Sequence, residues 1–90
     1  MWSAEVWVRI PWAASLKDRR QVAQSLVGRL GRQANLAVAE LSPDEEPRQL
    51  VLGVAAVSGS PAHARALVDA AIGAIEREGH DVVVRESGER

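Results

Sequence analysis

The stretch SLKDRRQ holds three cations, Lys17, Arg19 and Arg20, where a helix is expected to begin. Ser15 is a favourable N-cap, and Asp18 follows it at the spacing of a capping box. The amino end of a helix already carries a partial positive charge, so cations are disfavoured there. Free backbone N–H groups together with two or three cations would bind a phosphate or a carboxylate. We therefore take these three cations as candidates for an anion-binding or RNA-binding site.

The three cations differ in their place on the expected helix. At about 100° per residue from Leu16, Arg19 falls inside the apolar arc, whereas Lys17 and Arg20 lie on its flank. Two interpretations of Arg19 stay open. Its guanidinium either pairs with an internal acid such as Glu40 or binds an anion from outside.

Two further cations, Arg29 and Arg32, lie near the outer face of the same helix. They would extend the patch toward an RNA backbone, although ordinary surface charge explains them equally well. Residues 1–41 carry six cations and three acids, whereas residues 42–90 carry five cations and nine acids. This distribution argues against a uniformly basic nucleic-acid-binding domain and allows a local basic patch on the first half.

The acids do not form a recognisable catalytic pair. Residues 44–46 are three adjacent acids in a turn flanked by proline, where solvated side chains are expected. Glu40 lies within the apolar stretch AVAEL, and we expect it to pair with a basic residue such as Arg9. A structural ion pair is favoured over a catalytic acid.

Metal and cofactor sites are not predicted. His63 and His80 lie at opposite ends of the second expected helix and cannot share a metal ion. The chain has no Cys, so neither a disulfide nor a thiolate zinc site can form. Neither a phosphate-binding glycine loop nor a Ser-His-Asp arrangement is recognisable. We therefore expect no catalytic residues and no cofactor.

These candidates need elements that hold them, and the hydrophobic pattern supplies six. Residues 2–10 alternate between apolar and mostly polar side chains, as in a strand with one apolar face. An amphipathic helix follows from Ser15 to about Arg32, and a second is expected from the Ser60 cap to a stop at Gly79. The remaining strands are expected at residues 35–41, 50–58 and 80–86.

The order β-α-β-β-α-β predicts an α+β ferredoxin-like domain. Right-handed crossovers place both helices on one face of a four-stranded antiparallel sheet. Residues 1–90 are expected to form this single domain, with residues 85–90 as a frayed tail. No apolar run approaches the length needed to cross a bilayer, and the amino end alternates rather than resembling a signal peptide. We expect a soluble cytoplasmic protein.

The second sheet face is expected to be mostly apolar and uncovered. Monomers rarely expose an apolar patch of that size, which indicates a homodimer with sheet packed against sheet. A single Trp on this face is a poor match for the aromatic pairs with which some sheets stack RNA bases. The candidate dimer-face residues are Trp7, Ala37, Ala39, Val51, Gly53, Ala55, Val57 and Val83.

The stretches SLKDRRQV, NLAVAEL and RQLVLGVAAVS together resemble the YlxP-like family of small bacterial proteins of unknown function. The match covers nearly the whole chain. It implies a ferredoxin-like fold and suggests a role near the ribosome or RNA, since members are often encoded beside translation genes. The positions that match the family motif are Ser15, Leu16, Lys17, Arg19, Arg20, Asn35 and Glu40.

Three functions follow from these observations. The first is a non-enzymatic binding protein that uses the basic patch to contact the ribosome or RNA. The second is a structural homodimer. The third is a phosphate-handling enzyme of acylphosphatase type, which shares the fold but has a glycine-rich loop where residues 11–15 read PWAAS.

Overall fold

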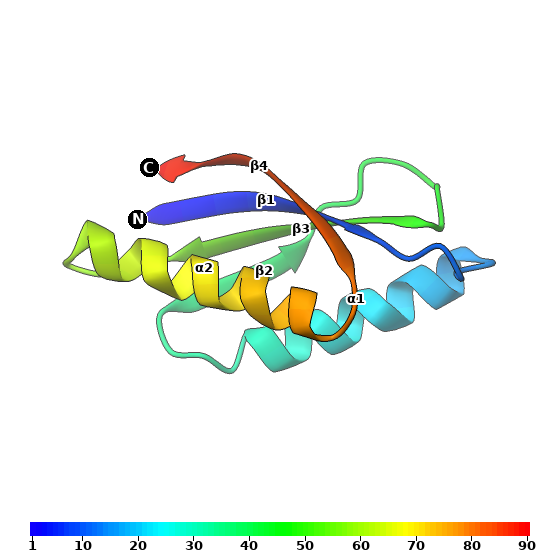
Figure 1. Ribbon diagram of the computed structural model, residues 1–90, viewed down its shortest axis with the longest axis horizontal. Helices are drawn as coiled ribbons and strands as arrows, with labels where there is room; N and C mark the ends of the chain where they lie inside the picture. Colours follow the sequence, from blue (N-terminus) through cyan, green and yellow to red (C-terminus); the bar gives the residue numbers. More distant parts are fainter.

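The computed structural model describes residues 1–90 and confirms the predicted element order. Four strands form one sheet in the order β2-β3-β1-β4, and every neighbouring pair is antiparallel. Both helices lie on one side of this sheet (Figure 1). The fold is therefore ferredoxin-like α+β. The elements are β1 (Trp2–Arg9), α1 (Leu16–Leu30), β2 (Leu36–Glu40), β3 (Gln49–Ala56), α2 (Pro61–Arg77) and β4 (Asp81–Glu89).

The helix boundaries follow the predicted signals. Ser15 caps α1 by accepting a hydrogen bond from the N–H of Asp18 at 3.2 Å. Asp18 in turn accepts from the N–H of Ala14 at 2.9 Å, so the two side chains satisfy backbone donors at the helix start. Ser60 caps α2 in the same way, and Gly79 ends the following turn with φ at +92°. Neither helix is long and apolar enough to span a membrane.

The core lies between the helices and one face of the central strands. The even-numbered residues Ala4 to Val8 of β1, Ile10 just after it, and Leu50 to Ala56 of β3 are at most 5% exposed. They pack with one side of each helix, where Leu26 of α1 is fully buried. Because successive strand residues alternate between faces, the odd-numbered residues point to the opposite, uncovered side. The predicted register is thus confirmed.

The predicted frayed tail at residues 85–90 is wrong. β4 continues to Glu89, which pairs with Trp2 at the start of β1. The terminal amine of Met1 lies 2.9 Å from a carboxylate oxygen of Glu89, and the N–H of Arg90 donates to the carbonyl of Met1 at 2.7 Å. The two termini therefore lie together (Figure 1). Cross-strand pairing, invisible in the sequence GER, extends this strand.

Candidate functional site

The Arg19 side chain lies against the loop between β2 and β3. Its Nη1 donates to the carbonyl oxygens of Asp44 at 2.9 Å and Glu46 at 2.8 Å. Its Nε lies 3.7 Å from a carboxylate oxygen of Glu40, and the side chain is 12% exposed. This loop meets the start of α1 because β2 ends beside the first turns of the helix. Arg19 thus holds the loop to the helix, and an internal acid is its partner.

The expected pairing of Glu40 with Arg9 is wrong. Glu40 contacts Arg19 and accepts a hydrogen bond from the Ser42 hydroxyl at 2.7 Å. Strand alternation explains the difference, because Glu40 occupies a position turned toward the helix layer, whereas Arg9 belongs to the row of β1 on the opposite face. The partner of a strand residue depends on the face that it occupies.

The five candidate cations do not act alike. Arg29 forms a bidentate pair with Glu78, at 2.6 and 2.7 Å, and thereby joins the ends of α1 and α2. The side chains of Lys17, Arg20 and Arg32 form no hydrogen bond or ion pair within the chain. Three of the five are therefore free to meet a partner, and two of these three lie at the start of α1.

Asn35, one of the positions that match the family motif, has a structural role. Its backbone has φ at +69°, a left-handed conformation that Asn tolerates better than most residues. Its Nδ2 donates to the carbonyl of Val57 at 2.9 Å, and its own carbonyl accepts from the N–H of Val57 at 3.0 Å. Asn35 therefore positions the start of β2 beside the end of β3.

The uncovered sheet face, which we call the open face, carries most of the predicted apolar residues. Trp7 lies between Val51 and Val83 in the register of the three strands. Val83 is 52% exposed and Val57, just beyond β3, is 61% exposed. Val51 lies on the same face but is only 2% exposed. It packs beneath this surface and offers almost no area to a partner.

Trp7 has two polar neighbours that the sequence did not single out. Its Nε1 donates to a carboxylate oxygen of Glu5 at 2.7 Å, and the guanidinium carbon of Arg85 lies 4.4 Å from its ring centroid. Glu5 could have been found, since it stands two residues away on the same face. Arg85 required the pairing of β4 with β1. Arg85 occupies one face of the ring, which leaves little room there for a stacked base.

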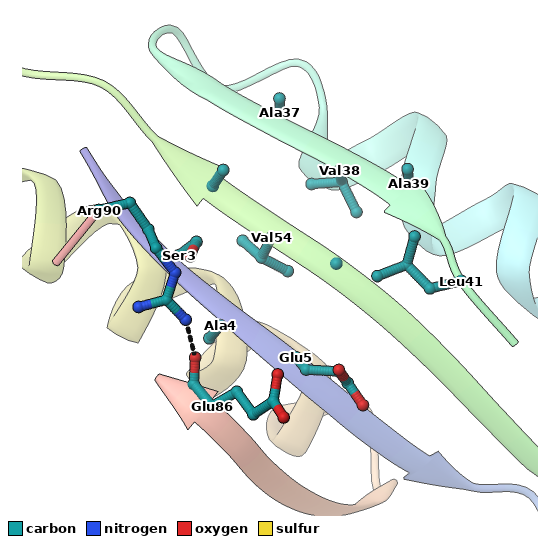
Figure 2. A pocket seen from close by; sticks show the side chains of 12 residues that line it. Ser3, Ala4, Glu5, Ala37, Val38, Ala39, Leu41, Val54, Glu86 and Arg90 are labelled. Atoms are coloured by element: carbon teal, nitrogen blue, oxygen red, sulfur yellow. Dashed lines mark hydrogen bonds between the residues drawn. The ribbon is translucent and has the colours of Figure 1, made fainter. Parts of the chain in front are cut away.

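Beside Trp7 the open face contains a hollow of about 340 Å³, which we call the open-face hollow. Ala37 and Ala39 of β2 and Leu41, just after this strand, stand at one side of it, and Glu5, Glu86 and Arg90 stand at the other (Figure 2). The floor consists of small residues, and at Gly53 a side chain is excluded because a Cβ there would lie 2.7 Å from the side chain of Leu41. The floor residues are Ser3, Ala37, Ala39, Gly53 and Ala55.

The remaining candidates stay apart. His63 and His80 flank opposite ends of α2, and no three His, Asp or Glu side chains gather in a group that could hold a metal ion. Trp12, in the loop before α1, is 63% exposed.

The fold and its surfaces describe a small α+β domain with one covered and one open sheet face. Comparison with known families matches residues 1–87 to "Protein of unknown function (DUF503)". Because this match spans nearly the whole chain, the protein belongs to that family. A comparison with curated proteins gives no match. Family membership assigns neither a partner nor a reaction.

Proposed function

We propose that this DUF503 chain is a YlxP-like, non-enzymatic binding protein of the cytoplasm that assembles as a homodimer through its open face. The observation that supports this proposal most is the apolar surface left uncovered by the helices. Exposed Val57 and Val83, together with half-buried Trp7 and the alanines of β2, lie over the side of the sheet that has no helix. Contiguous apolar surface of this kind marks an interaction site.

The shape of the open face favours a second copy as its partner. Trp7, capped by Arg85, forms a bulky part, and the open-face hollow lies beside it with a floor of small residues. A two-fold axis that lies in the interface, parallel to both sheets, can bring the bulky part of each protomer to the hollow of the other, because a two-fold interface is self-complementary. Glu5 and Arg85 carry opposite charges on this face, so each also offers the partner copy a complementary group.

The area is sufficient for association but leaves little surplus. With strands ~4.8 Å apart and ~3.3 Å per residue, four strands of about eight residues cover roughly 500 Å² in projection. Side-chain relief raises this value toward the ~800 Å² per partner of a standard interface. We therefore expect a dimer that dissociates on dilution.

The RNA or ribosome partner is less well supported. Arg19 and Arg29 are engaged within the chain, and three acids of the β2–β3 loop stand near the start of α1. Lys17, Arg20 and Arg32 alone do not make a patch comparable to that of a nucleic-acid-binding domain. Association with RNA stays a prediction that rests on the family resemblance.

The homodimer is tested by Ala37→Glu, which places a charge in the exposed, small-residue part of the open face. Burying an unpaired carboxylate between two sheets is costly, so the variant should be monomeric at concentrations where the wild type is dimeric. Multi-angle light scattering across a dilution series measures this. The matched control is Ala66→Glu on the exposed side of α2, which should leave the dimer unchanged.

A wild-type chain that remains monomeric at every concentration would contradict the homodimer. Equal dissociation by Ala37→Glu and Ala66→Glu would show that the copies associate elsewhere. Circular dichroism of both variants should match the wild type, since neither position is in the core.

A further inference from the structure

β2 is an edge strand whose outer side is unpaired. The N–H of Leu41, the residue after β2, donates to the carbonyl of Val51 at 2.8 Å, so the odd-numbered positions of this segment are bonded to β3. In an antiparallel pair these positions alternate with ones whose backbone groups point away. The N–H and C=O groups of Val38 and Glu40 therefore face outward from the sheet.

This edge lacks the devices that usually prevent strand addition. Proteins protect exposed edges with proline, bulges or charged side chains. β2 reads LAVAE, pairs with β3 without a register shift, and has one charged residue, Glu40, which is held by Arg19. The opposite edge differs, because β4 has a bulge and several charged residues. β2 is thus the edge better prepared to receive a strand.

A groove of about 350 Å³ lies between α1 and the end of β2, which contributes Glu40 to its lining. We call it the α1–β2 groove. Ala23 and Val27 give it an apolar wall, and Gln24 stands on the same helix beside them. Its lining residues are Ala23, Gln24, Val27, Gly28 and Glu40.

Gly28 has no structural reason to be glycine. It lies in the interior of α1 with negative φ, where glycine costs about 1 kcal/mol relative to Ala. A Cβ at this position would meet nothing within 4 Å. Its effect is to keep the α1–β2 groove wide where a second backbone could approach closely.

The unpaired cations at the start of α1 belong to the same side of the helix. Lys17, Arg20, Gln24 and Gly28 follow one another at spacings of three or four residues, which places them along one stripe. Gln24 and Gly28 line the groove. Lys17 and Arg20 lie on the same stripe, nearer the start of α1, where a strand added to β2 would continue past Glu40. The side chains of Lys17 and Arg20 make no ion pair within the chain, so these two cations are available to the carboxylates of a ligand.

We infer that the α1–β2 groove binds an extended peptide, which adds a fifth strand to β2 and places acidic residues beside Lys17 and Arg20. The outward backbone groups of Val38 and Glu40 recognise the main chain. Alternate peptide side chains lie against Val27 on one side and beside Ala39 on the other, so apolar residues should alternate along the peptide. This site does not depend on the homodimer, because sheet-to-sheet packing leaves the strand edge accessible.

The test uses the full chain and a phage-displayed library of random linear dodecapeptides. Selection should enrich peptides with alternating apolar residues and clustered carboxylates. A synthetic copy of an enriched peptide should slow hydrogen exchange at the amides of Val38 and Glu40, measured by NMR. Binding of this copy should weaken about tenfold in a Lys17→Ala/Arg20→Ala variant at low salt, since two exposed ion pairs are lost.

Gly28→Gln is the blocking variant, because it fills the groove while improving helix propensity. It should fold at least as stably as the wild type and lose the peptide. Ser25→Gln adds the same side chain on the exposed outer side of α1 and should bind normally.

Three results would overturn the inference: no enrichment of peptides, equal binding by Gly28→Gln and the wild type, or unchanged exchange at Val38 and Glu40. An oligouridine arm addresses the other class of ligand. Binding of oligouridine that requires Lys17 and Arg20 but is unaffected by Gly28→Gln and by the peptide would assign these cations to RNA instead.

Discussion

The two faces of the sheet carry similar apolar residues in different environments. On the covered face, Val6, Val8 and Leu52 are fully buried against the helices. On the open face, Val83 is 52% exposed, whereas its neighbour Val82 on β4 packs against the core. Two helices can cover only one side of the sheet. Apolar residues on the other side therefore need a reason outside the isolated chain, which is why we assign them to an interface.

Each face also has one tryptophan beside one arginine. On the covered side the guanidinium carbon of Arg65, from α2, lies 5.1 Å from the ring centroid of Trp2. On the open face Arg85, from β4, lies 4.4 Å from Trp7. The pairs are alike in chemistry, but the first joins a helix to the sheet and the second stays within the sheet. The Trp2–Arg65 pair therefore stabilises the packing of α2 on the sheet, whereas the Trp7–Arg85 pair shapes the open face.

The largest expected effect is on the covered face. Leu52→Ala removes a fully buried side chain and leaves a cavity, which should lower the free energy of unfolding by about 3 kcal/mol. Val83→Ala on the open face should lower it by less than about 1 kcal/mol, because that side chain is half exposed in the protomer. Urea unfolding at two protein concentrations separates loss of the fold from loss of assembly. Equal costs for both variants would remove the distinction between the faces.

The second effect concerns Arg19, the candidate cation that binds the β2–β3 loop on the covered side of the sheet. Arg19→Ala removes two hydrogen bonds to carbonyl oxygens and the contact with Glu40, which should cost about 1–2 kcal/mol. Lys17→Ala, two residues away, should change stability by no more than about 0.5 kcal/mol. Chemical denaturation measures both. A cost for Lys17→Ala as large as that for Arg19→Ala would mean that their roles inside the chain do not differ.

The smallest effect compares the two arginines beside tryptophan. Arg85→Ala and Arg65→Ala should each cost about 0.5–1 kcal/mol through loss of the cation–π contact. Only Arg85→Ala should also raise the dissociation constant of the dimer, measured by sedimentation equilibrium. The same change in both variants would place the interface away from the open face.

Much of the fold was predictable because its signals are local. The alternation of residues 2–10, the Ser15 and Ser60 caps and the stop at Gly79 each act within a few residues, so their sequence is sufficient. The end of the chain was not predictable in this way. Residues 85–90 lack an apolar pattern, and their strand exists because β1 supplies the hydrogen-bond partners.

In the candidate site, too, local features were predictable from the sequence and contacts between distant residues were not. The sequence identified Arg19 as a misfit on the apolar arc and named Glu40 as one partner. It could not identify the carbonyl oxygens of Asp44 and Glu46, because backbone groups of a loop carry no residue signature. Gly28 was noticeable as a helix glycine, but its meaning depended on the neighbouring edge of β2.

The sequence by itself determined the element order, the face of each strand residue and the position of the cations along α1, because periodicity and capping are properties of adjacent residues. Tertiary structure decided which cations are satisfied, how far β4 extends and where surfaces are left open. These outcomes depend on contacts between residues that are distant along the chain. Arg19 and Lys17 differ by two positions in the sequence, yet only the approach of the β2–β3 loop gives one of them an internal partner.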